Sequence, residues 1–313
     1  MPHPGYQLLT VYLCLLISST AMTSLRRVGD YLSLVKFSHT VFALPFALLG
    51  FFLGVLDRGS FAPRQLVLVL ACMIFARSAA MGFNRWLDRD IDRKNDRTAV
   101  REIPAGTISA RSALLFVIVN ALLFIGAAGL LNPLCLVLSP LALVVILGYS
   151  YTKRFTYLCH FVLGLGLALA PVGAYLAVTA EWALLPALYS LVVLLWVSGF
   201  DIIYALQDES FDRKEQLFSI PVRLGARNAL RLGRIVHTIC AALLLTALYL
   251  QYAQYPAFGW LTLAAGAIFL GLLVYQHTLV SPTDLSRVNL AFFTTNGVAS
   301  LVFGTLSILD MYT

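Results

Sequence analysis

A short polar segment, NRWLDRDIDRKND at residues 84–96, interrupts an otherwise apolar sequence and holds residue types that can do chemistry. Within it, Asn84, Asp88 and Asp92 are spaced four residues apart, so on a helix they lie along one face. Carboxylates one turn apart repel each other and weaken a helix. The spacing therefore predicts that a ligand, such as a divalent cation, offsets this repulsion.

A second segment, YALQDESFD at residues 204–212, repeats the pattern. Asp208 and Asp212 are again four residues apart, and Asp201 precedes Asp208 by two helical turns. Mg²⁺ prefers oxygen ligands and is typically held by one or two carboxylates together with substrate phosphates. Two facing pairs of carboxylates would grip a diphosphate through bridging Mg²⁺ ions. The competing interpretation is a helix laced with ion pairs, because arginines alternate with the aspartates.

The elements that must position these segments belong to a membrane protein. The sequence is 60% hydrophobic and only 12% charged, against roughly 25% charged residues in soluble domains. Its apolar runs reach about twenty residues, the length that a helix needs to cross ~30 Å of hydrocarbon. We count nine such runs and predict an all-α, polytopic membrane protein. They cover residues 37–56, 65–83, 112–131, 133–150, 158–178, 183–203, 235–250, 256–276 and 289–309.

The distribution of basic residues predicts the orientation. With the N-terminal side of the first span in the cytoplasm, all but three of the 22 Lys and Arg residues fall on the cytoplasmic side. The exceptions are Arg58 and Arg64 on the opposite side and Arg77 within the second span. By the positive-inside rule, both acidic segments then face the cytoplasm. The same topology explains the net charge of +7, so we reject nucleic-acid binding. A diphosphate bound at a membrane surface implies a lipid diphosphate, and a polyprenyl diphosphate fits.

Basic residues in and beside the membrane indicate contacts to a substrate. Arg77 lies seven residues before Asn84 on the same helical face, and an intramembrane arginine is costly enough to mark a functional site. The alternative for Arg77 is a buried ion pair with an acid such as Asp201. Lys153 and Arg154 occupy a short cytoplasmic turn suited to holding phosphate oxygens. The alternative for this pair is a plain positive-inside anchor.

Neither of two glycine-containing stretches indicates chemistry. GFFLG at residues 50–54 has the spacing that brings two membrane helices close together. LGLGLALAP at residues 163–171 sits inside an apolar run with no strand before it, so it is not a dinucleotide-binding fingerprint. The five cysteines occur singly and without ligand spacing, which argues against structural zinc and a disulfide framework.

Residues 1–22 form an apolar N-terminal extension. No Lys or Arg precedes its apolar run, as a secretory signal would require. It is either an extra interfacial or membrane helix, an uncleaved anchor, or upstream sequence from a mistaken start with Met22 as the true one. We favour the third interpretation, which leaves a single membrane domain over residues 23–313.

Four motifs together resemble those of the UbiA-type intramembrane aromatic prenyltransferases. The resemblance runs from about Arg27 to the C-terminus, and the motifs stand in the family's order. They are NRWLDRDID, RTAVREIPAG, YTKRFT and YALQDESFD. The resemblance implies nine helices around a central cavity open to lipid, in a bacterial inner membrane. It also implies Mg²⁺ as cofactor, with a polyprenyl diphosphate and a small hydroxylated aromatic acid as substrates.

The resemblance further implies roles for individual residues. The Mg²⁺ ligands would be Asn84, Asp88, Asp92, Asp208 and Asp212, and the four aspartates among them would be catalytic. The diphosphate would be bound by Lys153, Arg154, Arg97 and Arg101. We assign Arg77, Asp201 and Tyr204 to binding of the aromatic acceptor. For Arg77 the alternative partner is the diphosphate, and we favour the acceptor's carboxylate. The expected mechanism is ionisation of the prenyl diphosphate, followed by attack of an electron-rich ring carbon on the allylic cation.

The chain departs from the family pattern at two places. Arg85 follows Asn84 where the family commonly has Asp, and REIPAG at residues 101–106 replaces an Arg-Pro start. These departures resemble the menaquinone branch of the futalosine pathway more than the ubiquinone enzyme. The acceptor is therefore either 4-hydroxybenzoate or 1,4-dihydroxy-6-naphthoate. A secondary transporter with paired acidic cation sites is the alternative class, although both acidic segments lie at one side rather than at the bilayer midplane.

Overall fold

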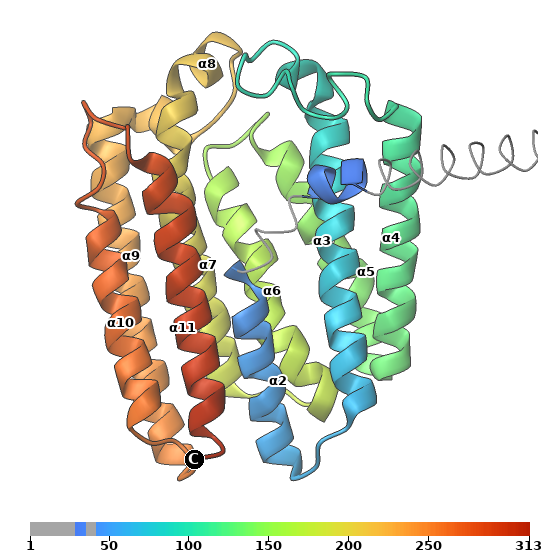
Figure 1. The fold of residues 1–313 in the computed structure, drawn as a ribbon, viewed down its shortest axis with the longest axis vertical. Coiled ribbons are helices and arrows are strands. Elements are labelled where there is room, and N and C mark those ends of the chain that lie inside the picture. Colours follow the sequence, from blue (N-terminus) through green and yellow to red (C-terminus); the bar gives the residue numbers. More distant parts are fainter. Residues whose placement is uncertain (1–28, 36–41) are drawn as a thin grey trace, which may run out of the picture.

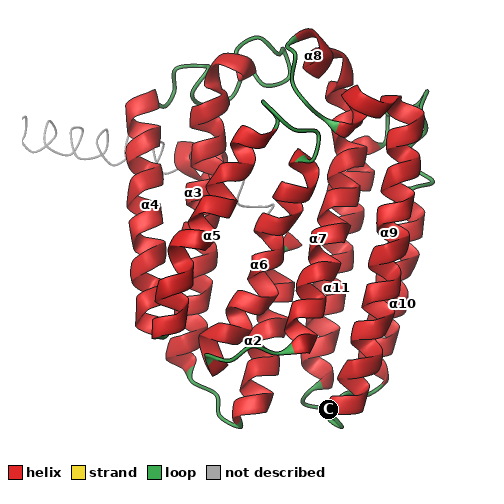
Figure 2. Cartoon of the chain, turned by 180° about the vertical axis from the view of Figure 1, so that it is seen from behind, coloured by secondary structure: helices red, strands yellow, loops and turns green. Residues whose placement is uncertain are grey.

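The computed structural model describes residues 29–35 and 42–313, and this part of the chain is helical and contains no strand (Figures 1 and 2). Nine helices in it run along the long axis of the molecule. They are α2 (Leu44–Arg58), α3 (Pro63–Asp92), α4 (Ala110–Leu131), α5 (Pro133–Thr152), α6 (Cys159–Thr179), α7 (Leu184–Ala205), α9 (Ile220–Gln254), α10 (Trp260–Gln276) and α11 (Thr295–Asp310). Short helical turns add η2 (Leu206–Asp208), α8 (Glu209–Lys214) and η3 (Leu290–Thr294).

The prediction of an all-α, polytopic membrane protein is confirmed. Seven helices in the described ranges are long and apolar enough to cross a membrane, while α10 has 17 residues and α2 has 15. The nine predicted runs correspond to the nine long helices in order. The start of the first run, 37–56, and the whole extension, 1–22, lie outside the described residues.

Local sequence signals set the helix ends opposite the acidic segments. Gly59 ends α2 in the left-handed conformation (φ 67°), where glycine carries no Cβ penalty. Pro63 and Pro133 occupy the first turns of α3 and α5, a position that needs no backbone N–H donor. The Asn132 side chain accepts a hydrogen bond from the Cys135 N–H at 2.8 Å and caps α5.

The helices pack in chain order, and α2 closes the arrangement. Each long helix from α3 onward contacts the next one, α11 contacts α2, and α2 packs against α6. Gly50 permits this last contact, because a Cβ there would clash with the backbone carbonyl of Pro171. Gly164 of the LGLG run likewise sits against the Leu194 carbonyl of α7. The GFFLG motif therefore packs two helices, as predicted, and Gly164 allows a second close helix contact.

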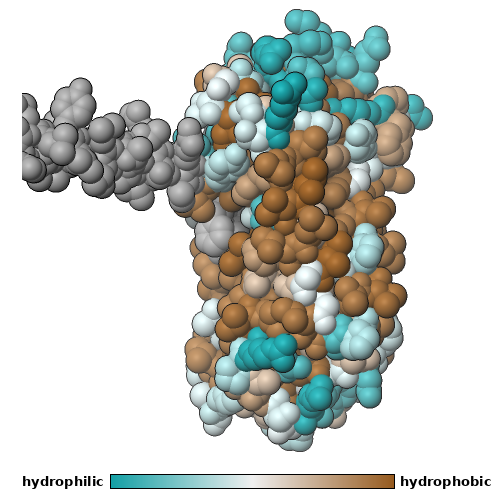
Figure 3. Space-filling model, turned by 90° about the vertical axis from the view of Figure 1, so that its right-hand side faces the viewer, coloured by the Kyte–Doolittle hydropathy of each residue, from teal (hydrophilic) through white to brown (hydrophobic). Residues whose placement is uncertain are grey.

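The core of the bundle lies on the α2, α7 and α9–α11 side. Four of its large aromatic side chains, Phe46, Trp196, Phe269 and Phe303, are fully buried and contact one another through their rings. A smaller share of α3, α4 and α5 is buried inside the molecule. The face seen in Figure 3, the right-hand side of Figure 1, is hydrophobic over its middle and hydrophilic at its upper end. This pattern suits helices that face lipid.

Candidate active site

In the last turns of α3, the aspartates of the first acidic segment differ in their exposure to solvent. Asn84, Asp88 and Asp92 follow one another along one helical face, and Asp88 and Asp92 are 1% and 5% exposed. Asp90 points out from the same turns, with its side chain 67% exposed and 3.7 Å from Arg93. The solvated ion-pair interpretation therefore describes Asp90, whereas the two carboxylates with the predicted metal spacing are buried.

The turn after α5 supplies two cations to Asp88. Lys153 Nζ lies 2.5 Å from Oδ2 of Asp88, and Arg154 Nη2 lies 2.8 Å from Oδ1. Asn84 Nδ2 donates to the same Oδ2 at 3.2 Å. This turn is the YTKRFT motif, so the structure joins two of the motifs that are 65 residues apart in sequence.

Asp92 is held by the connection between α3 and α4. Arg101 Nη1 donates to Oδ1 of Asp92 at 2.7 Å. Oδ2 of Asp92 is buried and has no hydrogen-bond partner among the described residues. A buried, unsatisfied carboxylate oxygen is costly, and a bound cation would satisfy it.

The second acidic segment does not lie on one continuous α-helix, so Asp201, Asp208 and Asp212 belong to three successive elements. The helix α7 ends at Ala205, three residues of tighter turn follow, and Asp208 ends that turn. Asp212 belongs to the separate short helix α8. The tighter turn rotates the chain by a larger angle per residue than an α-helix does. The spacing of residues in the sequence does not reveal this change.

Cations link the two acidic segments at one end of the bundle, where α8 and the α3–α4 connection meet (Figure 1). Arg97 binds Asp208 through both Nη2 (2.6 Å) and Nε (3.3 Å), and Asp92 also lies within its electrostatic range. Burial alone would lower the pKa of Arg97, but Asp208 outweighs it and raises the pKa, so this cation stays charged. Lys153, bound to Asp88, also lies within electrostatic range of Asp212.

The donor set fits Mg²⁺ bound together with a substrate. In the described residues no three His, Cys, Asp or Glu side chains converge on one point. The carboxylates form two groups, each able to offer one or two oxygens. Mg²⁺ is commonly held by one or two carboxylates with phosphates completing the shell. With the unsatisfied oxygen of Asp92, the residues present fit a metal whose site is completed by a diphosphate.

The residues predicted to bind the aromatic acceptor lie deeper in the bundle than the carboxylates and cations described above, or beside them. Arg77 is part of α3, two turns before Asn84, with Tyr149 of α5 within its electrostatic range. Asp201 does not pair with Arg77. Instead, Asp201 Oδ2 lies 2.7 Å from Nδ1 of His160. Because the Ile220 N–H donates to Nε2 of this histidine, the proton sits on Nδ1 and is donated to Asp201.

Tyr204 borders a pocket of about 440 Å³ between the end of α7 and η3. Its ring stacks on Phe292 with 4.0 Å between centroids. Arg97 has Tyr204 within electrostatic range, so the pocket adjoins the linked cations. Its lining consists of Tyr204, Asn289, Leu290, Phe292, Phe293 and Thr294.

Sequence reasoning missed two residues of this site. Arg85 was read only as a departure from the family, yet it is 5% exposed and has Asp92 and Arg101 within electrostatic range. Arg85 and Asp92 are seven residues apart and therefore lie on one helical face. This spacing indicates that Arg85 belongs to the site. Ser150 is buried and accepts a hydrogen bond from Asn84 Nδ2 at 3.4 Å. Nothing in the local sequence indicated that contact.

Comparisons with known proteins agree with this site and fold. Residues 43–298 match the model of the UbiA prenyltransferase family. The 4-hydroxybenzoate octaprenyltransferase of Aliivibrio fischeri (strain MJ11) is 31% identical over 247 residues, covering 79% of this chain and 84% of that protein. Its counterpart from Yersinia pseudotuberculosis serotype O:1b is 29% identical, covering 83% and 88%.

Solved structures show the same fold. A UbiA homolog from Aeropyrum pernix K1, in its apo form, is 33% identical with a TM-score of 0.78, covering 87% of this chain and 98% of that one. A UbiA homolog from Archaeoglobus fulgidus bound to GPP and Mg²⁺ is 20% identical with a TM-score of 0.73, covering 91% and 100%. This chain belongs to the UbiA prenyltransferase family. It is a multi-pass membrane enzyme of the prenyltransferase class.

Proposed function

We propose that this protein transfers a polyprenyl group from a polyprenyl diphosphate to a hydroxylated aromatic acid in respiratory quinone biosynthesis, with Mg²⁺ as cofactor. The observation that carries the proposal is the buried Asp88 and Asp92 pair, linked by basic residues to the segment of Asp208 and Asp212. The relatives' names support the acceptor class. The Archaeoglobus homolog bound to GPP and Mg²⁺ supports the metal and the donor.

The carboxylates and cations at this end of the bundle are suited to holding a diphosphate. We call them the charged layer, and its acids are Asp88, Asp92, Asp208 and Asp212. Asn84, Asp88 and Asp92 would bind Mg²⁺ on one side, and Asp208 and Asp212 on the other. The metal supplies positive charge that stabilises the departing diphosphate. The four predicted diphosphate ligands now contact carboxylates, and they would turn to phosphate oxygens once the carboxylates bind metal. They are Lys153, Arg154, Arg97 and Arg101.

The acceptor would lie deeper in the membrane than the diphosphate. Arg77 would pair with its carboxylate, since a guanidinium binds a carboxylate through two parallel hydrogen bonds. Asp201, oriented by His160, and Tyr204 would border the same space. The bond between the prenyl carbon and the diphosphate oxygen breaks, and a ring carbon attacks the resulting allylic cation and then loses its proton. Apolar helices around the site would keep out water that quenches the cation.

Two acceptors are candidates, and different observations favour them. The relatives named 4-hydroxybenzoate octaprenyltransferase favour 4-hydroxybenzoate. The departures at Arg85 and at residues 101–106 favour 1,4-dihydroxy-6-naphthoate. The bacterial relatives support a bacterial inner-membrane location, and the positive-inside distribution supports an orientation with the acidic segments facing the cytoplasm.

The purified protein in detergent tests the proposal directly. It should convert a prenyl diphosphate and one of the two acids into a prenylated acid, detected by mass spectrometry, without any second compartment. Chelation of Mg²⁺ should stop the reaction. Failure to prenylate either acid, in a preparation that still hydrolyses or binds the prenyl diphosphate, would contradict the acceptor class proposed here.

A further inference from the structure

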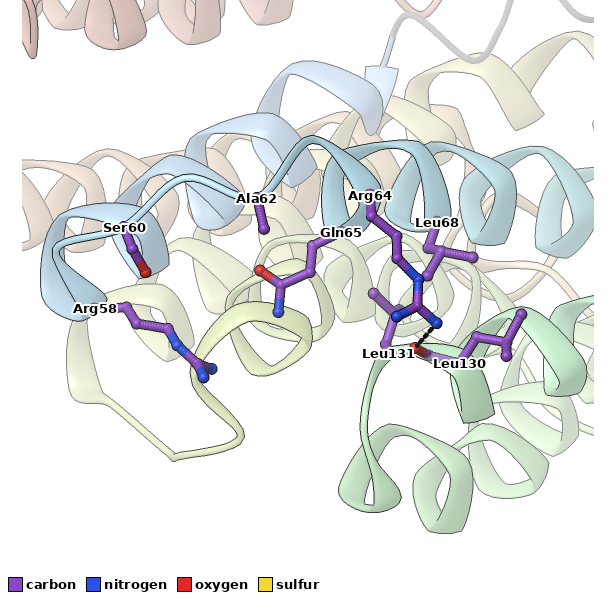
Figure 4. A pocket seen from close by; sticks show the side chains of 8 residues that line it. All are labelled: Arg58, Ser60, Ala62, Arg64, Gln65, Leu68, Leu130 and Leu131. Carbon is purple, nitrogen blue, oxygen red and sulfur yellow. Dashed lines mark hydrogen bonds between the residues drawn. The ribbon is translucent and has the colours of Figure 1, made fainter.

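A second pocket lies at the end of the bundle opposite the acidic segments (Figures 1 and 4). Its volume is about 280 Å³. It forms where α2 ends, α3 begins and α4 turns into α5. The residues that line it are Arg58, Ser60, Ala62, Arg64, Gln65, Leu68, Leu130 and Leu131.

Two arginines give this pocket its positive charge. Arg58 and Arg64 are the two basic residues that the predicted topology places on the side opposite the acidic segments. Arg58 Nη1 donates to the Val178 carbonyl, and Arg64 Nη2 donates to the Leu130 carbonyl at 3.4 Å. Each contact uses one of the five N–H donors that a guanidinium carries. In Figure 4 both guanidinium groups and the Gln65 amide extend to the same side of the α2–α3 connection.

Carboxylates at this end of the described chain do not neutralise these arginines. Neither Arg58 nor Arg64 has a carboxylate within ion-pair distance in the described residues. Asp57 accepts hydrogen bonds from the hydroxyls of Tyr175 and Tyr255. Asp310, at the same end, accepts from the backbone N–H groups of Gly259 and Thr262. The lining of the pocket therefore holds two cationic side chains and no carboxylate.

The remaining lining determines which anion fits. Leu68, Leu130 and Leu131 form an apolar wall, and Leu130 is 59% exposed, so this wall continues onto the lipid-facing surface of α3 and α4. Guanidinium groups bind phosphate oxygens through two parallel hydrogen bonds, and the N-terminus of α3 adds a favourable dipole. The pocket is smaller than most drug-sized sites, which suits a headgroup rather than a whole lipid.

We propose that this pocket binds the phosphate headgroup of an anionic glycerophospholipid, with the acyl chains lying along α3 and α4. Arg58 and Arg64 would contact the phosphate, while Ser60 and Gln65 would hydrogen-bond the headgroup. A bound lipid would tie the α2–α3 connection to the ends of α4 and α6, which the two arginines already contact. This site is separate from the acidic segments and does not depend on the proposed reaction.

The test uses the full-length protein in detergent and phosphatidylglycerol as the probe. We expect phosphatidylglycerol to raise the Tm and to appear as a bound lipid by native mass spectrometry, whereas phosphatidylcholine does neither. Replacing both arginines (Arg58→Gln and Arg64→Gln) should weaken phosphatidylglycerol binding by about tenfold or more. Arg111→Gln, an exposed arginine at the opposite end, is the matched control and should bind like the wild type.

Three further measurements test the lipid site. If the double variant does not fold, hydrogen exchange of residues 58–66 in the wild type should still slow on addition of phosphatidylglycerol. Prenyl transfer by the double variant should be unchanged, because neither arginine is near the acidic segments. Equal binding by wild type and double variant would overturn the proposal, as would an equal Tm shift with inorganic phosphate, which would indicate a free-phosphate site.

Discussion

Lys153 Nζ lies 2.5 Å from Oδ2 of Asp88 and fixes the turn after α5 against the last turns of α3. The Asp88 side chain is 2% exposed, whereas that of Lys153 is 30% exposed. Arg154, 27% exposed, occupies the other carboxylate oxygen. A buried acid is thus covered by cations that an incoming anion can reach. This order of charges would suit the proposed diphosphate site, because Mg²⁺ would bind the carboxylate and the diphosphate would bind the two cations.

Asp88→Asn should lower kcat/KM for prenyl transfer by about a hundredfold or more, because the amide neither carries the charge that binds Mg²⁺ nor pairs with Lys153. Initial rates at saturating Mg²⁺ measure this. Asp90→Asn is the matched control on the same helix, and its exposed ion pair is worth little, so activity should stay within about threefold of the wild type. Similar losses in both variants would contradict the assignment of Asp88.

Arg97→Gln should raise the KM for the prenyl diphosphate by about tenfold, with little change in the KM for the aromatic acid. Arg97 joins the α3–α4 connection to Asp208 through two hydrogen bonds. Lys94→Gln is a control with the same loss of charge, since Lys94 joins the α3–α4 connection to Glu215 at the end of α8 but is 60% exposed. If both variants raise the KM equally, the effect comes from loosening the segments rather than from a diphosphate contact.

Local periodicity was sufficient to predict α3 and the buried face that carries Asp88 and Asp92. The apolar run defines the helix, and the spacing of four residues defines the face. Asp88 is buried while Asp90 is exposed, because residues two apart lie on different faces of a helix. The existence of the nine long helices was predictable for the same reason, because each contains a continuous apolar run. The start of α9 was not, because this helix begins at Ile220, fifteen residues before the predicted run 235–250, and its first turns carry arginines.

Other features depend on contacts between distant parts of the chain, and sequence patterns do not encode them. His160 and Asp201 pair across 41 residues, and no periodicity indicates this contact. The tight turn after Ala205 breaks the register of the second acidic segment, although its spacing matches that of the first. Arg85 is buried near residues from other elements, Arg101 of the α3–α4 connection and Tyr149 of α5, which its own helix does not reveal.

Gly50→Ala should lower the Tm, because its Cβ would clash with the Pro171 backbone, which cannot move aside as a flexible side chain would. Overpacking of this kind typically costs about 1–3 kcal/mol. Gly173→Ala is the control, since a Cβ at that helical position meets nothing within 4 Å. Thermal unfolding in the same detergent measures both. An unchanged Tm for Gly50→Ala would show that α2 and α6 can separate without loss of stability.

Mg²⁺ and inorganic diphosphate should stabilise the protein together but not separately. Each carboxylate group offers one or two oxygens, so the metal needs phosphate oxygens to complete its shell. Binding to the folded state alone raises the Tm, and a thermal shift with each component and with both tests this without any turnover. Asp88→Asn and Asp208→Asn should each abolish the joint effect. A full shift with Mg²⁺ alone would indicate a preformed metal site, against the arrangement described here.

Arg77→Ala should weaken the aromatic acid more than the prenyl diphosphate. Arg77 lies two turns before Asn84 on α3, about 10 Å deeper along the helix axis at 1.5 Å per residue. That depth suits an acceptor beside the reacting carbon rather than a diphosphate held at the charged layer. Loss of one charge-assisted pair in such surroundings costs about 2–5 kcal/mol, so the KM for the acid should rise at least about thirtyfold.

The matched variant is Arg77→Lys, which keeps the charge but loses the planar fork that binds a carboxylate through two hydrogen bonds. Its KM for the acid should fall between those of the wild type and Arg77→Ala. Apparent KM values for both substrates, measured for all three proteins, decide the assignment. If the KM for the prenyl diphosphate rises while that for the acid does not, Arg77 belongs to the diphosphate site, and the acceptor lies elsewhere in the bundle.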